Sequence, residues 1–191
     1  SKSIRHELLS YGGALIIRKN TPPSEGHKWI ALTGNTHANT FKGVPGFAEI
    51  EGAVGLRVED VLPGTSQGIR IDAGLIDITP FHLYDYSCLK NDWVLDIEIS
   101  GAKAHPPALT QEQLTVALPI GGMFLLNNDP VLGPLLIHRS HARELIKTPL
   151  LFNPDGTFRI ERINWPDVHQ KPYADLHQLL RDLTKRGMRK V

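Results

Sequence analysis

The sequence contains a single cysteine, Cys88, and this scarcity excludes a fold held together by intramolecular disulfides. It also lacks an apolar run long enough to span a bilayer, and residues 1–7 lack the apolar stretch of a signal peptide. These absences predict a protein of a reducing compartment, the cytoplasm, with no membrane partner.

The sequence also has no excess of charge of one sign. It contains 21 Lys and Arg and 20 Asp and Glu, which gives a formal net charge of +1. Proteins that bind nucleic acid usually carry a basic excess or a basic stripe. The basic cluster at residues 185–190 is typical of a solvated helix end. The sequence therefore disfavours nucleic acid and leaves a small molecule or another protein as the partner, without predicting an oligomeric state.

The length of 191 residues and an ordinary composition predict a single globular domain, residues 1–191. The expected fold class is α+β, with a strand-rich, mostly antiparallel core and a few helices. The clearest helix is amphipathic and C-terminal: Pro172 suits its first turn, and four leucines follow at the spacing of one buried face (Leu176, Leu179, Leu180 and Leu183).

Local patterns predict the remaining elements. Helices are expected at residues 4–11, from Thr110 onward and at 140–147. Strands are expected at 14–17, 29–32, 48–51, 55–59 and 93–99; residues 69–78 are expected to form a hairpin or one bulged strand, and residues 150–163 a hairpin. Residues 93–99 alternate apolar and acidic side chains, which predicts a strand whose acidic face meets solvent.

Nine histidines are the most distinctive presence in the chain, and His138 and His141 lie three residues apart. Residues at this spacing share one face of a helix, so the two imidazoles could converge on one divalent metal ion. Asp129, Glu144 or a more distant carboxylate would supply a third ligand. In the alternative, His138 ends a strand and His141 begins a surface helix, with no ion.

A second candidate site combines His27, Asp77 and Cys88. The segment Gly74-Leu75-Ile76-Asp77-Ile78-Thr79-Pro80 resembles the strand of transglutaminase-like and papain-like thiol enzymes in which an Asp orients the catalytic His. The resemblance implies a Cys nucleophile, a His base and an orienting Asp. Cys88 follows Asp77 instead of preceding His27, so only a permuted arrangement could use it. In the alternative, Cys88 is a small core residue.

Two weaker candidates are a carboxylate cluster and a loop. Asp96 and Glu98, joined by Asp72 and Asp77, would suit a divalent cation, or they are a solvated sheet face. The polar loop over residues 33–46 is long enough to suggest binding, or it is an ordinary surface excursion.

Two functions are compatible with these residues. The first is a small soluble enzyme, a hydrolase or group-transfer catalyst that uses His with a carboxylate, a metal or Cys88. The second is a non-catalytic interaction module whose histidines are structural, with a degenerate transglutaminase- or papain-like fold as one form of it. An active site would require at least two histidines beside a carboxylate in a cleft.

Overall fold

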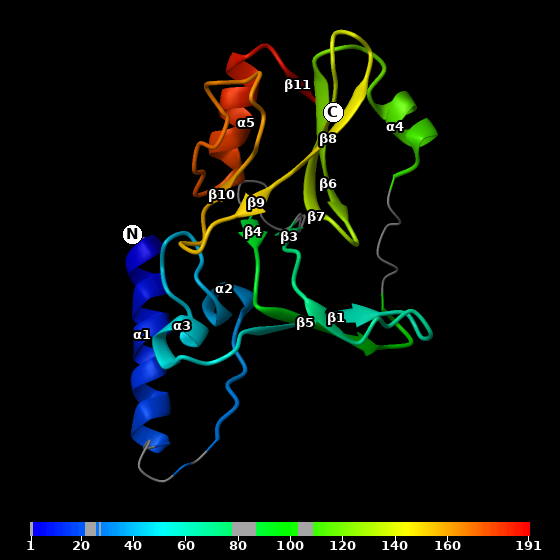
Figure 1. Ribbon diagram of the computed structural model, residues 1–191. Coiled ribbons are helices and arrows are strands. Elements are labelled where there is room, and N and C mark those ends of the chain that lie inside the picture. The colour runs from blue at the N-terminus through cyan, green and yellow to red at the C-terminus, as the bar shows by residue number, and fades with distance from the viewer. Residues whose placement is uncertain (1, 22–25, 27, 78–86, 103–108) are drawn as a thin grey trace. The chain divides into compact units, whose positions relative to one another are not determined.

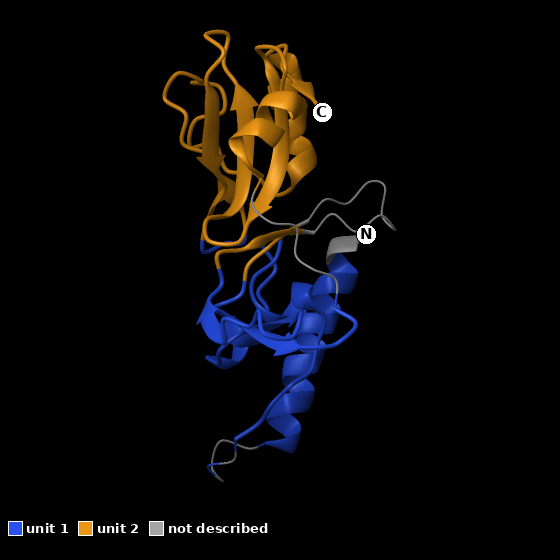
Figure 2. Cartoon of the chain, turned by 90° about the vertical axis from the view of Figure 1, so that its right-hand side faces the viewer, with its two compact units in different colours: residues 1–72, 91–102, 154–156 blue, residues 73–90, 103–153, 157–191 orange. Residues whose placement is uncertain are grey.

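The computed structural model describes residues 2–21, 26, 28–77, 87–102 and 109–191, and the chain forms two compact units (Figure 2). Unit 1 comprises residues 1–72, 91–102 and 154–156, and unit 2 comprises residues 73–90, 103–153 and 157–191. The described ranges hold five helices and eleven strands in mostly antiparallel sheets, which confirms the α+β class. The single domain over residues 1–191 stays a prediction.

Unit 2 is built on a four-stranded sheet in the order β11–β6–β7–β8. Its elements are β3 (Leu75–Asp77), β4 (Ser87–Leu89), α4 (Gln111–Ala117), β6 (Met123–Asp129), β7 (Gly133–Arg139), β8 (Leu145–Pro149), β9 (Leu151–Phe152), β10 (Phe158–Arg159), α5 (Leu176–Lys185) and β11 (Arg189–Lys190). Helices α4 and α5 lie on opposite sides of the sheet in Figure 1.

Both faces of the central strand β7 are therefore covered, and each of its seven residues is buried. Leu136 packs in a cluster with the leucines of α5, whereas Leu135 and Ile137 pack against Leu114 and Leu118. This alternation between two apolar layers explains why the strand reads as a continuous apolar run.

Unit 1 contains three helices and a three-stranded sheet in the order β1–β5–β2, with β1 and β5 parallel and β2 antiparallel to β5. Its elements are α1 (Lys2–Asn20), α2 (Asn35–Ala38), α3 (Phe47–Glu51), β1 (Leu56–Val61), β2 (Ile69–Ile71) and β5 (Trp93–Glu98). Among the described residues, both clusters of buried hydrophobic side chains belong to unit 2.

The first helix runs through the glycines that were expected to end it. α1 continues to Asn20, so the helix end at residue 11 and the strand at 14–17 are wrong. A Cβ atom on Gly13 would lie 2.5 Å from the ring of Phe47, so the glycine allows close packing inside the helix. Tertiary packing has outweighed the low helix propensity of glycine here.

Three other local predictions are corrected. Residues 48–51 belong to helix α3, residues 29–32 form no strand, and the apolar stretch 69–78 divides into β2 and β3, which belong to different sheets. Several expectations are confirmed: the capping box of Thr110 at α4, the β9–β10 hairpin and the C-terminal helix, which begins at Leu176 instead of Pro172. Within the described ranges, no helix is long and apolar enough to traverse a bilayer.

Candidate protein-binding groove

The sheet of unit 1 presents an apolar face to solvent. Paired residues on neighbouring strands share a face, and Trp93 pairs with Leu56 on one side and Ile71 on the other. Six side chains on this face are between 40% and 70% exposed, and we call them the open sheet face: Leu56, Val58, Ile69, Ile71, Trp93 and Ile97. The acidic face of residues 93–99 was expected to meet solvent. Glu98 is exposed, but Asp96 is buried, so this prediction is wrong for Asp96.

The opposite face of the same sheet carries charges that pair with one another. Arg57 donates two hydrogen bonds to the carboxylate of Asp72, at 3.0 and 2.8 Å, and also bonds Glu59. Arg70 bridges Glu59 and Asp96. Burial alone would lower the pKa of Arg57, but its bonds to Asp72 and Glu59 raise it above the usual value.

This ion-pair network explains which face is inside. Arg57, Asp72 and Asp96 are each less than 10% exposed, and an uncompensated charge in such a position would be costly. Because side chains alternate along a strand, placing the charged positions inward forces the apolar positions outward. The carboxylates of Asp72 and Asp96 therefore form ion pairs with arginines. Both residues were members of the carboxylate cluster that was predicted to bind a divalent cation.

A groove of about 970 Å³ adjoins the open sheet face. Its walls are the extended segment 28–33, helix α3 with the residues that follow it, and the sheet residues Leu56, Val58, Ile69 and Trp93. Ile30 and Leu32 are 93% and 98% exposed, while Trp29 is half-buried. This volume lies at the upper end of the range for pockets that hold small molecules.

Polar contacts fix the loop that lines one end of the groove. The side-chain amide of Asn39 donates to Glu49 and Asp92, both at 3.2 Å, and Asp92 also accepts the backbone N–H of Gly55 at 2.7 Å. A Cβ atom on Gly55 would overlap the Asn39 amide, so only glycine allows this approach. The groove is therefore formed by structured chain, and it includes Asn35 and Ala38 from the loop whose length suggested binding.

A histidine pair that sequence patterns do not reveal lies beside this loop. The rings of His6 and His37 stack with centroids 4.2 Å apart, and Ser10 contacts His37 Nδ1 at 3.1 Å. Burial lowers the pKa of both rings, and their mutual repulsion adds to the effect for His37. Nothing in the spacing of these residues predicts the pair, because helix packing brings them together.

The structure bears only partly on the predicted thiol site. His27 lies outside the described residues, and Asp77 ends β3, where it pairs with Ser87 in β4. Cys88 is 8% exposed and belongs to the larger hydrophobic cluster of unit 2. This placement supports the alternative of a small core residue, and the catalytic assignment of His27, Asp77 and Cys88 stays a prediction.

The helix expected at residues 140–147, which would have placed His138 and His141 on one face, does not form. His138 lies in β7 and is 3% exposed, whereas His141 is exposed in the turn before β8. Asp129 lies at the other end of the β6–β7 hairpin from His138. No group of three His, Cys, Asp or Glu able to hold a metal occurs within the described ranges. The metal site at His138 and His141 stays a prediction, but the helix that was expected to bring the two side chains together is absent from this part of the structure.

Comparisons with protein families, curated proteins and solved structures found no match. Function must therefore be inferred from the chemistry and exposure of the surfaces themselves.

Proposed function

We propose that the chain is an interaction module in which the groove and the open sheet face of unit 1 bind helix α1 of a second copy of the chain. The observation that carries the proposal is the outward apolar face of the sheet, with its charged face turned inward. A sheet with one apolar face gains stability when another layer covers that face. The hydrolase and group-transfer hypotheses stay predictions.

The size of the apolar surface favours a protein over a small molecule. Ile71 and Ile97 on the open sheet face do not line the groove, so the apolar surface continues beyond it. Contiguous exposed patches of this kind commonly mark interaction sites between proteins. A helix is about 10 Å wide and matches three strands spaced by about 5 Å.

Helix α1 has the chemistry that this surface requires. Six of its apolar side chains are exposed, and four of them recur at intervals of four, three and four. We call these four the α1 stripe: Ile4, Leu8, Tyr11 and Leu15. The inward positions Ser10 and Ala14 are buried. This spacing places the four side chains on one side of the helix, and the exposed Leu9 and Ile16 lie outside the stripe.

Helix α1 and the rest of unit 1 also carry opposite net charges. Residues 2–20 contain four Lys and Arg and one Glu, whereas the rest of unit 1 contains more Asp and Glu than Lys and Arg. Asp60, which pairs with Ile97 on the open sheet face, is exposed. Each copy thus offers a basic, striped helix and an acidic, apolar sheet, and a reciprocal exchange closes as a twofold dimer.

Sedimentation equilibrium of the chain tests this proposal. The intact chain is expected to dimerise, and Leu8→Glu in the α1 stripe or Val58→Glu in the sheet should each weaken the dimer at least 10-fold. Val131→Glu is the matched control, because Val131 is 78% exposed in unit 2 and outside both surfaces. Circular dichroism confirms that each variant folds. A chain that stays monomeric at 0.5 mM, or equal effects of all three changes, would overturn the proposal.

A mixing experiment identifies the geometry. The Leu8→Glu chain keeps an intact sheet, and the Val58→Glu chain keeps an intact stripe, so their mixture should form heterodimers through one restored helix-on-sheet contact. A dimer made by pairing two α1 helices would survive Val58→Glu, and a dimer of two sheets would survive Leu8→Glu. Either result would contradict the reciprocal arrangement.

A further inference from the structure

The loop over residues 160–173 in unit 2 is closed by hydrogen bonds although it contains no helix or strand of its own. The backbone N–H of Trp165 donates to Arg162 O at 2.8 Å, and that of His169 donates to Trp165 O at 2.8 Å. Gln170 N–H bonds Ile160 O at 2.9 Å, which closes the loop. The backbone N–H of Arg162 donates to His169 Nδ1 at 3.0 Å. These bonds set the course of the backbone that carries Arg162 and Trp165.

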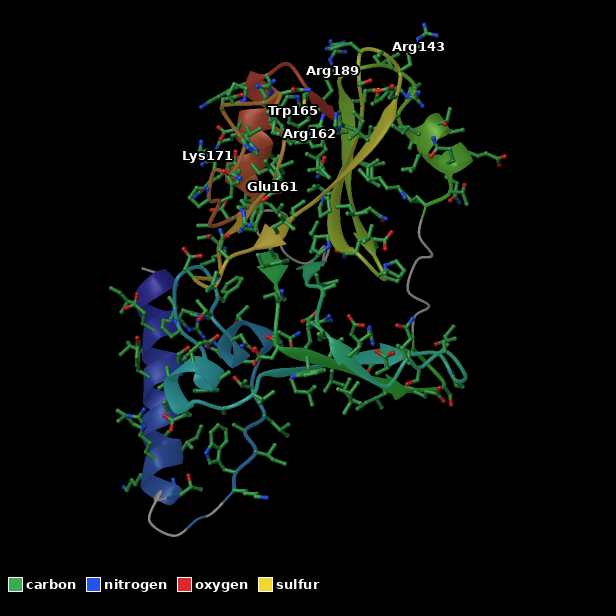
Figure 3. All side chains as sticks on the ribbon, viewed as in Figure 1. Arg143, Glu161, Arg162, Trp165, Lys171 and Arg189 are labelled. Carbon is green, nitrogen blue, oxygen red and sulfur yellow. The ribbon has the colours of Figure 1, made fainter. Side chains whose placement is uncertain are left out.

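Two guanidinium groups lie against the indole of Trp165. The Arg162 Cζ atom is 5.0 Å from the ring centroid, and the Arg186 Cζ atom is 5.2 Å from it. Figure 3 shows Arg162 beside Trp165. Arg186, just after α5, bonds Asp167, whereas Arg162 has no ion pair with a carboxylate among the described residues. The aromatic ring therefore holds two like charges in one place.

The third side of this cluster is a buried histidine. The His138 ring lies 4.7 Å from the Trp165 ring, and His138 is 3% exposed. Burial, followed by the charge of Arg162, lowers the pKa of His138 to about 4, so the imidazole is neutral near pH 7. No hydrogen-bond partner for His138 Nδ1 or for the buried Nε of Arg162 occurs among the described residues.

Unsatisfied buried polar atoms are uncommon and call for a partner. Both orphaned atoms belong to residues that contact Trp165, and one of them is on an arginine without a counter-ion among the residues that the structure describes. Residues 157–191, which include both arginines, contain eight Lys and Arg and four Asp and Glu, so this segment has a positive net charge. The cluster thus combines positive charge, hydrogen-bond donors and a fixed aromatic wall.

We propose that Arg162, Trp165 and Arg186 form a binding site for an oxyanion of the phosphate type. The two terminal Nη groups of the Arg162 guanidinium can donate two parallel hydrogen bonds to a pair of phosphate oxygens. Arg186 already bonds Asp167. A dianion carries enough negative charge to attract Arg186 in addition, whereas a single carboxylate carries only one charge. This site lies within unit 2 and is independent of the helix-binding surface proposed for unit 1.

Nuclear magnetic resonance with inorganic phosphate tests the site directly. The indole N–H signal of Trp165, assigned by its loss in Trp165→Phe, should shift saturably as phosphate replaces chloride at constant ionic strength. Arg162→Gln should weaken this binding at least 10-fold. Arg159→Gln is the matched control, because Arg159 is another guanidinium of unit 2 that bonds Asn153 and Glu161. It should leave the titration unchanged.

Three results would overturn the proposal. The first is a shift that does not saturate up to 100 mM phosphate, which would indicate general screening of charge. The second is an equal loss of binding in Arg162→Gln and Arg159→Gln. The third is acetate binding as tightly as phosphate, which would show that the site takes single carboxylates and does not select a phosphate-type dianion.

Discussion

Unit 2 buries its apolar side chains between a sheet and two helices, whereas the sheet of unit 1 buries charges and exposes apolar side chains. The contrast is clearest between β7, buried at every position, and β5, where Val94 and Asp96 are buried while Trp93 and Ile97 are exposed. Hydrophobicity determines which side chains are buried in unit 2. In the sheet of unit 1, the pairing of arginines with carboxylates determines which face is buried.

A buried ion-pair network can thus orient a strand without being the main source of stability. Desolvating Arg57 and Asp72 offsets much of their attraction, so the network contributes little net energy. Breaking it is costly all the same, because the remaining partner would stay buried and unpaired. Unit 1 therefore leaves an apolar sheet face exposed, whereas both faces of the central strand of unit 2 are covered.

The greatest loss of stability is expected in the core of unit 2. Phe124→Ala should cost about 3–5 kcal/mol of unfolding free energy, because Phe124 is fully buried in the larger cluster. Ile71→Ala on the open sheet face should cost less than about 0.5 kcal/mol, because Ile71 is 70% exposed. Urea denaturation at a protein concentration that keeps the chain monomeric measures both. Similar costs for the two variants would show that the sheet face is covered.

The second effect tests the charged interior of unit 1. Arg57→Met should cost about 3 kcal/mol, because it leaves Asp72 buried without its arginine. The double variant Arg57→Met/Asp72→Leu should recover at least half of this loss. Fluorescence in a Trp165→Phe background reports on unit 1 through Trp29 and Trp93. A double variant as unstable as the single one would contradict the argument.

Sequence patterns predicted the elements whose signals are local. The Thr110 capping box, the turn between β9 and β10, and the leucine spacing of α5 each lie within a few residues and are confirmed. Patterns failed where a distant contact decides the outcome. Gly13 stays helical because Phe47 packs on it, and Asp96 is buried because Arg70 pairs with it from another strand.

The candidate sites were less accessible to sequence reasoning than the fold. Segment 29–32 was recognised as apolar, but its exposure at Ile30 and Leu32 depends on how the rest of unit 1 folds. Arg162 and Arg186 meet at Trp165 only because the loop returns to the end of α5. The contact of His138 with Trp165 likewise follows from packing between distant segments.

The third effect compares the histidines of the two units. The pKa of His138 is lowered from 6.5 to about 4, so the neutral ring stabilises the fold fully above pH 6.5. As the pH falls toward 4, His138 binds a proton in the unfolded chain but stays neutral in the folded chain. The free energy of unfolding falls by up to about 3 kcal/mol as a result. His6 and His37 in unit 1 shift in the same direction.

Urea denaturation between pH 4 and 7 measures this dependence. His138→Leu should flatten the profile over that range, because the unfolded variant has one fewer proton to bind. His141→Ala is the matched control, since His141 is exposed in the adjacent turn and lies outside the contact of His138 with Trp165. An unchanged slope in His138→Leu would show that His138 takes up its proton in the folded state.

The weakest effect concerns how helices begin in each unit. In unit 2, the side chain of Asp175 caps α5 by accepting the N–H of Gln178 at 3.0 Å, whereas α2 in unit 1 begins at Gly34 without a side-chain cap. Asp175→Ala should cost about 1 kcal/mol, and Gly34→Asp should gain a few tenths of a kcal/mol at most. Gly34 has φ of −67°, so a side chain is tolerated there. Thermal unfolding of both variants measures the difference; a gain from Gly34→Asp as large as the loss from Asp175→Ala would mean that the missing cap, and not the shortage of buried apolar side chains, limits the stability of unit 1.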